Sequence, residues 1–166
     1  MPDVSTEIPI ATTTLTSDSS TITFSSIPST YTDLRLVMSG LSSTANNQGI
    51  RFNSDTATNY SSTVLYGNGT SATSAKYTST SYLHIASDIV VGPTAYPVSV
   101  LIDISSYSGA TNKPCLINTA LDISGSGEVV SRVGLWRSTS AITSITFMRT
   151  AGNFSTGTTA TLYGIL

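Results

Sequence analysis

Residues 21–40 read TITFSSIPSTYTDLRLVMSG, and this stretch contains two short runs in which apolar and polar residues alternate. A loop with a proline, a tyrosine and an aspartate joins the two runs. Because alternation with a period of two is typical of β-strands that bury one face, the runs predict strands over residues 21–24 and 33–39. Pro28 fixes φ and has no N–H to donate, so it ends the pairing of the first strand.

The loop between these two strands is predicted to be a structural corner, which crosses from one sheet of a sandwich to the other. Ile27 and Tyr31 are the residues in it that can close the end of an apolar core. Asp33 stands at the end of the loop, where an aspartate side chain commonly accepts hydrogen bonds from backbone N–H groups. We therefore expect this loop to have a structural role.

The same period of two continues along the chain, and no window of a dozen residues keeps the apolar spacing of an amphipathic helix. The clearest run is 96–105, whose alternate apolar residues predict a central strand. Turn signals such as Gly67-Asn68-Gly69 separate the runs. Besides the two strands above, strands are predicted at residues 8–15, 49–53, 62–66, 76–87, 96–105, 114–122, 128–137, 142–149 and 159–165.

About ten short strands at intervals of roughly 10 to 18 residues are typical of a sandwich or barrel. The spacing therefore predicts an all-β fold of antiparallel strands, either a β-sandwich or a β-barrel. We expect one domain over residues 8–166, preceded by a polar N-terminal arm at residues 1–7.

Charged residues make up only 10% of the 166-residue chain, against about 25% in an average soluble protein, and the net charge is −2. Serine and threonine make up about a third of it, so hydroxyl groups rather than charges keep the surface wet. No basic patch is present to attract nucleic acid or a membrane surface. The hydrophobic fraction of 39%, in ordered alternation, argues against a disordered chain.

The N-terminal residues MPDVSTEIPIATTTL lack the positive start and apolar segment of a signal peptide. No apolar stretch approaches the roughly 20 residues of a membrane-spanning helix. We therefore expect synthesis in a cytoplasm and no membrane partner.

No local motif selects a pair of carboxylates of the kind that glycosidases place around the scissile bond. Asp18 lies in a predicted loop and Asp33 follows a turn, where hydrogen bonds to the backbone are the usual reason for an aspartate. The segment YGNGTS, residues 66–71, lacks the lysine and the helix of a phosphate-binding loop. We predict no catalytic residue, no cofactor and no metal, and hence no enzyme.

The chain has one cysteine, Cys115, and one histidine, His84. A single cysteine excludes an intrachain disulfide, and zinc sites take several such ligands. Cys115 lies in the apolar run PCLINTALD, so a small buried hydrophobic residue is the favoured interpretation. A nucleophilic cysteine would need His84 as its partner, and the sequence leaves any role of either residue beyond packing open.

Two kinds of residue are candidates for binding. Trp136 and Tyr66 offer aromatic faces on which a sugar can stack, although packing in a core or interface is favoured. Arg132, Arg137 and Arg149 lie on or beside predicted strands, and arginine is enriched at subunit interfaces. In a chain with so few charges, these three are candidates for intersubunit contacts.

Several separate motifs occur in a fixed order, and they are TITFSSIPSTYTDLRLVMSG, IRFNSD followed by NYSSTVLYGNGTS, SYSGATNKPCLINTA, VGLWRSTSAITSITF and GNFSTGTTATLYGIL. Together they resemble a recurrent β-rich domain in virion surface proteins of tailed bacteriophages. The resemblance runs from about residue 8 to the C-terminus. It implies a jelly-roll-like β-sandwich on the outer surface of the virion, assembled in the host cytoplasm.

The resemblance also implies a non-enzymatic structural role, and it carries over no catalytic residue. The family members are capsid decoration (cement) proteins or parts of tail fibres. The expected partners are further copies in a homotrimer and the major capsid protein or other virion proteins. We favour a decoration protein, because only about seven residues precede the first predicted strand and a fibre subunit needs an anchor and a shaft. The alternative is a tail-fibre or baseplate component that binds a receptor or a host-surface glycan.

Overall fold

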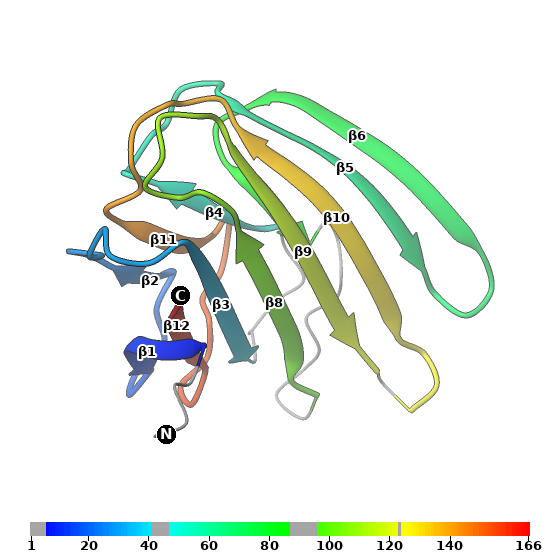
Figure 1. Cartoon of the computed structure of the whole chain (residues 1–166). Helices are drawn as coiled ribbons and strands as arrows, with labels where there is room; N and C mark the ends of the chain where they lie inside the picture. Colours follow the sequence, from blue (N-terminus) through cyan, green and yellow to red (C-terminus); the bar gives the residue numbers. More distant parts are fainter. Residues whose placement is uncertain (1–5, 41–46, 87–95, 123) are drawn as a thin grey trace.

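The computed structural model describes residues 6–40, 47–86, 96–122 and 124–166 (Figure 1). Within these residues the chain forms strands, turns and loops, and no helix. The strands are β1 (Glu7–Thr14), β2 (Thr21–Phe24), β3 (Asp33–Gly40), β4 (Gln48–Phe52), β5 (Tyr60–Gly67), β6 (Ala72–Thr80), β7 (Leu83–Ala86), β8 (Val98–Ile104), β9 (Lys113–Leu121), β10 (Glu128–Trp136), β11 (Ile145–Arg149) and β12 (Thr159–Ile165).

The strands form two antiparallel sheets that pack together. The large sheet has eight strands in the order β1-β12-β3-β8-β9-β10-β5-β6, and the small sheet has four in the order β2-β11-β4-β7. In Figure 1 the large sheet is strongly curved, and β5 and β6 form a long hairpin at its right-hand side. The predicted all-β antiparallel sandwich is confirmed, while its jelly-roll-like character remains a prediction.

The core lies between the two sheets, and in β2, β3, β8, β9, β10, β11 and β12 alternate residues point into it. β8 illustrates this, because Val98, Val100, Ile102 and Ile104 are buried while the residues between them are not. The strand lies between β3 and β9, so its predicted central place is confirmed. The apolar phase predicted in the second quoted run, Leu34, Leu36 and Met38, is also fully buried.

One predicted strand, residues 76–87, is wrong as a single element. The chain forms β6 and β7 there, and the two strands belong to different sheets. Ser79 has a φ of 56°, and the ladder between β5 and β6 shifts register between Tyr60 and Ser62. The pairing is therefore irregular around a serine in the left-handed region, a conformation that favours glycine, and it resumes at Thr80, where β6 ends. Of the predicted N-terminal arm, residues 1–5 lie outside the described residues, and Glu7 already belongs to β1.

The loop at residues 25–32 joins β2 of the small sheet to β3 of the large sheet, as predicted. Tyr107, which is fully buried, holds it from the side. The Tyr107 hydroxyl donates a hydrogen bond of 2.5 Å to the Pro28 carbonyl and accepts one of 3.3 Å from the Tyr31 N–H. Burial raises the pKa of Tyr107, so this hydroxyl keeps its proton in neutral solution.

The apolar residues of this corner close the end of the core. Ile27 is 5% exposed and donates its N–H to the carbonyl of Thr143 at 3.0 Å. Tyr31 packs over Gly164 of β12, where a Cβ would lie 2.3 Å from the ring. Asp33 accepts a hydrogen bond of 2.7 Å from the Ser106 N–H, so its predicted role as an acceptor from the backbone is confirmed.

Candidate functional site

The outer face of the large sheet carries an unusual group of exposed aliphatic side chains on β9, β10 and β5. Their exposed fractions are 67% for Val129, 61% for Val133, 58% for Leu65 and 44% for Leu116. Leu135 lies half-buried on the same phase of β10 as Val133. We call Leu65, Leu116, Val129, Val133 and Leu135 the outer patch. Large apolar side chains left in water on adjacent strands mark a surface that a partner can cover.

The strand register makes the outer patch continuous. Val133 on β10 lies opposite Leu116 on β9 and Thr63 on β5. Two residues further along, Ser131 lies opposite Leu65 on β5. Directly opposed residues of antiparallel strands project from the same face, with their Cβ atoms roughly 4.5–5.5 Å apart. The aliphatic side chains therefore form one surface, with small hydroxyl residues between them.

This surface is also neutral. At the outward positions of β9, β10 and β5, all of which the structure describes, no side chain is charged. Lys76 on the edge strand β6 borders the surface on one side. On the other side, Asp103 on β8 lies directly opposite Leu116 and pairs with Arg35 through an Nε–Oδ1 contact of 2.7 Å. Arg35 also pairs with Glu7. A charged partner surface would therefore find little to pair with over the outer patch itself.

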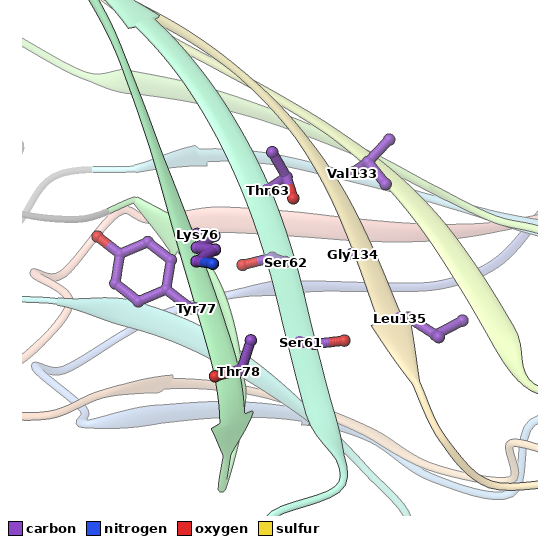
Figure 2. A pocket seen from close by; sticks show the side chains of 9 residues that line it. All are labelled: Ser61, Ser62, Thr63, Lys76, Tyr77, Thr78, Val133, Gly134 and Leu135. Carbon is purple, nitrogen blue, oxygen red and sulfur yellow. The ribbon is translucent and has the colours of Figure 1, made fainter.

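The outer patch is hollowed rather than flat. One depression has a volume of about 250 Å³. Figure 2 shows residues that line it, Val133 and Leu135 from β10, Ser61 and Thr63 from β5, and Lys76 from β6. A second depression of about 270 Å³ lies over the stretch of the same strands that carries Leu65 and Val129. A third of about 230 Å³ follows at the hairpin ends, around Gly67–Gly69 and Glu128. Short serine, threonine and glycine residues between longer aliphatic ones create these hollows.

Beneath the outer patch, the inward residues of the same strands hold a buried arginine. Arg132 is 1% exposed, and its Nη1 donates a hydrogen bond of 3.0 Å to Ser62 Oγ. Its guanidinium carbon lies 5.1 Å from the centre of the Tyr77 ring, a cation–π distance. Burial lowers the pKa of Arg132, although a guanidinium remains charged in proteins. The ring of His84 stacks on that of Tyr77, with 4.3 Å between the ring centres, and its centre lies 4.5 Å from that of the Tyr82 ring.

The hypothesis that three arginines make intersubunit contacts is wrong for two of them. Arg132 lies inside the sandwich, and Arg149 is only 5% exposed, with its guanidinium carbon 5.7 Å from the Phe154 ring centre. Burial lowers the pKa of Arg149 as well. Arg137 is exposed, and its Nη2 donates a hydrogen bond of 2.6 Å to the Thr58 carbonyl. Alternation in EVVSRVGLWR places Arg132 on the same phase as Val130 and Trp136. This shared phase was the signal in the sequence that Arg132 is buried.

The aromatic faces proposed for sugar stacking do not form a platform. Trp136 is 2% exposed, its Nε1 donates a hydrogen bond of 2.7 Å to Asp55 Oδ2, and its ring centre lies 5.5 Å from that of Phe52. The favoured interpretation, core packing, is confirmed for Trp136. Tyr66 is half-buried, packs against the core and lines the second depression.

The described aspartates make local contacts with the backbone or with arginine. Asp18 accepts from the Thr156 N–H at 2.9 Å, and Asp122 from the Gly125 N–H at 2.8 Å. Asp55 accepts from Trp136, from Asn59 and from the Ala57 N–H, and these hydrogen bonds lower its pKa against the opposing effect of burial. Asp3 and Asp88 lie outside the described residues.

Cys115 is 3% exposed in the core, and burial raises the pKa of its thiol. The interpretation as a small buried hydrophobic residue is confirmed. Within the described residues, no three His, Cys, Asp or Glu side chains gather where they could hold a metal ion. That part of the chain also has no helix that is long and apolar enough to cross a membrane.

No protein-family model, curated protein or solved structure matches this chain. The outer patch therefore stands as a candidate site on its geometry. Sequence reasoning missed it, although a signal was present. In EVVSRVGLWR, Val129, Val133 and Leu135 are apolar on one phase while Arg132 and Gly134 stand on the other. A strand with apolar residues on its outward phase indicates a face that is covered in an assembly.

Proposed function

We propose that this chain is a non-enzymatic structural protein of a tailed-bacteriophage particle, and specifically a capsid decoration (cement) protein that docks through the outer patch. One observation carries this proposal: aliphatic side chains on three adjacent strands stand in solvent on a neutral face. The resemblance of the sequence motifs to those of phage virion surface proteins supports the class of partner that we propose, another virion protein such as the major capsid protein.

The energetics of the outer patch suit such a contact. Complete burial of one aliphatic side chain that was exposed contributes roughly 1.5–3 kcal/mol. Several such residues on one surface can therefore offset much of the loss of translational and rotational freedom on docking, which costs about 4–15 kcal/mol. Many equivalent copies on a capsid lattice can each bind independently in this way.

The first test is the number and place of the copies on the particle. A decoration protein is expected in hundreds of copies on the head, measured by quantitative mass spectrometry of purified virions and by labelling in electron microscopy. Particles that lack it should still inject DNA. About a dozen copies on the tail would instead support the tail-fibre or baseplate alternative, and binding of the purified protein to host cells or glycans would support it further.

The second test is direct binding to heads that lack the protein. Val133→Lys and Leu65→Lys each place a charge in the contact, so we expect each to weaken binding at least about ten-fold. Thr21→Lys, at an exposed position at the start of β2 in the small sheet, is the matched control and should bind like the unmodified protein. Equal binding by all three variants would contradict docking through the outer patch.

A further inference from the structure

β6 is an open edge of the large sheet. Among the described strands, only β5 pairs with it. The backbone N–H and C=O groups on its other side have no partner strand in the described part of the chain. The pairing with β5 is regular from Ala72 to Tyr77. The residues on this stretch are mostly exposed, and Lys76 is the one charged side chain in the strand. A long, regular edge of this kind is a template for pairing with another strand.

The opposite edge of the same sheet is protected. β1 contains Pro9, its ladder shifts register between Pro9 and Ala11, and Glu7 at its start pairs with Arg35. Proline, a bulge and a charge are three devices by which proteins prevent sheets from joining at their edges. The edge strands of the small sheet, β2 and β7, have four residues each. β6 has nine residues. Its regular stretch has no proline and no bulge, and Lys76 is its one charged side chain.

We infer that β6 pairs in antiparallel orientation with β6 of a second copy of this chain, about a two-fold axis at Ala75. In such a pair the central residue lies opposite its own copy, and every other pairing follows from it. Ser74 then lies opposite Lys76 of the second copy, and Thr73 lies opposite Tyr77. Overlap extends from Ala72 to Thr78, just beyond the regular stretch of the strand.

Two neighbouring registers are less favourable. An axis at Lys76 would set the two lysines directly opposite each other, and like charges in that position destabilise a sheet. An axis at Ser74 would shorten the overlap to Ala72–Lys76. The Ala75 register keeps the two lysines apart and uses most of the strand.

The pairing would join two large sheets into one surface, with both outer patches on the same face. A two-fold axis perpendicular to the sheet keeps outward residues outward in both copies, because Ser74 and Lys76 share the outward phase with Leu65. The inference does not rest on the proposed function, since it concerns the protein alone in solution. It gives an even number of copies, unlike the homotrimer that the family resemblance implies.

The first experiment measures the mass of the full chain in solution by native mass spectrometry and sedimentation across a concentration series. We expect a dimer. Ser74→Lys introduces two like-charge contacts with Lys76 and should raise the dissociation constant roughly ten-fold, whereas Ser74→Glu should lower it by a similar factor. Thr21→Lys and Thr21→Glu, on an edge strand of the small sheet, are the matched controls and should leave it unchanged.

The second experiment tests the register by cross-linking. Opposed Cα atoms in an antiparallel pair are about 4.5–5.5 Å apart, which a disulfide can bridge. Ala75→Cys should therefore form a disulfide-linked dimer under mild oxidation. The two copies of residue 73 would be about 13 Å apart along the strand, so Thr73→Cys should not cross-link. Cys115 is buried and does not compete.

A monomer, a trimer, or a dimer that responds equally to the Ser74 and Thr21 variants would overturn the inference, as would faster cross-linking of Thr73→Cys than of Ala75→Cys. The two proposals fail separately. A Ser74→Lys variant that no longer dimerises but still binds heads would leave the docking proposal intact. A Val133→Lys variant that no longer binds heads but still dimerises would leave the inference of β6 pairing intact.

Discussion

At the scale of single residues, buried hydroxyl groups fix the positions where strands end. Tyr60 at the start of β5 is fully buried, and its hydroxyl accepts a hydrogen bond of 3.1 Å from the Phe52 N–H at the end of β4. The same hydroxyl lies 3.3 Å from the carbonyl oxygen of Asp55. It therefore links the large sheet to the last residue of a small-sheet strand. Burial raises the pKa of Tyr60 to about 12.

This pKa predicts loss of stability in alkali. Between the ordinary tyrosine pKa of about 10 and the raised value of about 12, the folded protein keeps a proton that the unfolded chain releases. The free energy of unfolding should therefore fall as pH rises through this window, by at most about 1.4 kcal/mol per pH unit from this residue. Burial also raises the pKa values of Tyr82 and Tyr107, which act in the same direction.

Urea denaturation from pH 9 to pH 12 measures the effect. Tyr60→Phe should be less stable at neutral pH by about 1–2 kcal/mol, because the Phe52 N–H loses its acceptor, and should lose stability less steeply in alkali. Tyr163→Phe, on the half-exposed outer phase of β12, is the control and should keep the steeper slope. Parallel slopes for Tyr60→Phe and the unmodified protein would contradict the assignment.

At the scale of elements, the corner between β2 and β3 was predictable because local sequence signals mark it, although its contacts are with residues far along the chain. Pro28, Ile27 and Asp33 each have a local reason to stand in a loop between two alternating runs, and alternation alone located most strands. The boundary between β6 and β7 was not predictable in this way. It follows directly after Thr80, next to a positive φ at Ser79, and the sequence has no glycine or proline there to mark a break.

The outer patch escaped prediction for a related reason. Alternation says which residues share a face of a strand, but in β10 both phases carry apolar side chains. Placing Arg132 inside and Val133 outside requires knowing that Ser62 and Tyr77 supply partners for the guanidinium. Those residues are about 55 to 70 positions away in the chain. The local sequence shows two apolar phases, and only these long-range partners decide which of them faces inward.

The corner itself can be tested at Gly164. A Cβ at this position would lie 2.3 Å from the Tyr31 ring, so Gly164→Ala must displace the ring and should cost about 1–3 kcal/mol of unfolding free energy. In a Tyr31→Ala background the same change should cost much less, which a double-mutant cycle measures by chemical denaturation. Gly67→Ala, where the nearest atom is 3.8 Å away, is the control and should change stability little. Equal costs in both backgrounds would show that the Tyr31 ring is not what excludes a side chain.

At the scale of the whole molecule, the outward positions of β9, β10 and β5 carry no charge, and charged side chains stand only beside them, at Lys76 on β6 and at Asp103 on β8. Electrostatic contacts between exposed groups weaken as salt rises, because the Debye length falls from about 10 Å at 0.1 M to about 3 Å at 1 M. Contacts between aliphatic side chains lack this dependence. The outer patch, with no charged outward residue on β9, β10 or β5, therefore belongs to the second kind.

Docking to heads should accordingly resist salt. We expect the dissociation constant to change by less than about three-fold between 0.1 M and 1 M sodium chloride, as measured by titration of heads with labelled protein. Dimers of the Ser74→Glu variant offer an internal contrast, because the contacts between the introduced carboxylate and Lys76 of the second copy should weaken over the same range. A steep salt dependence of docking by the unmodified protein would point to a charged surface elsewhere on the molecule.

The place of β12 between β1 and β3 also sets the order in which the large sheet can assemble. β3 lies on one side of β12 and β1 pairs with the other side, so both strands wait for a segment that lies far along the chain. Until then, β1 and the near side of β3 have no ladder. A fold dominated by such distant pairings is expected to form slowly. During that interval the early strands expose edges that neighbouring chains can reach, which makes dilution a condition of efficient refolding.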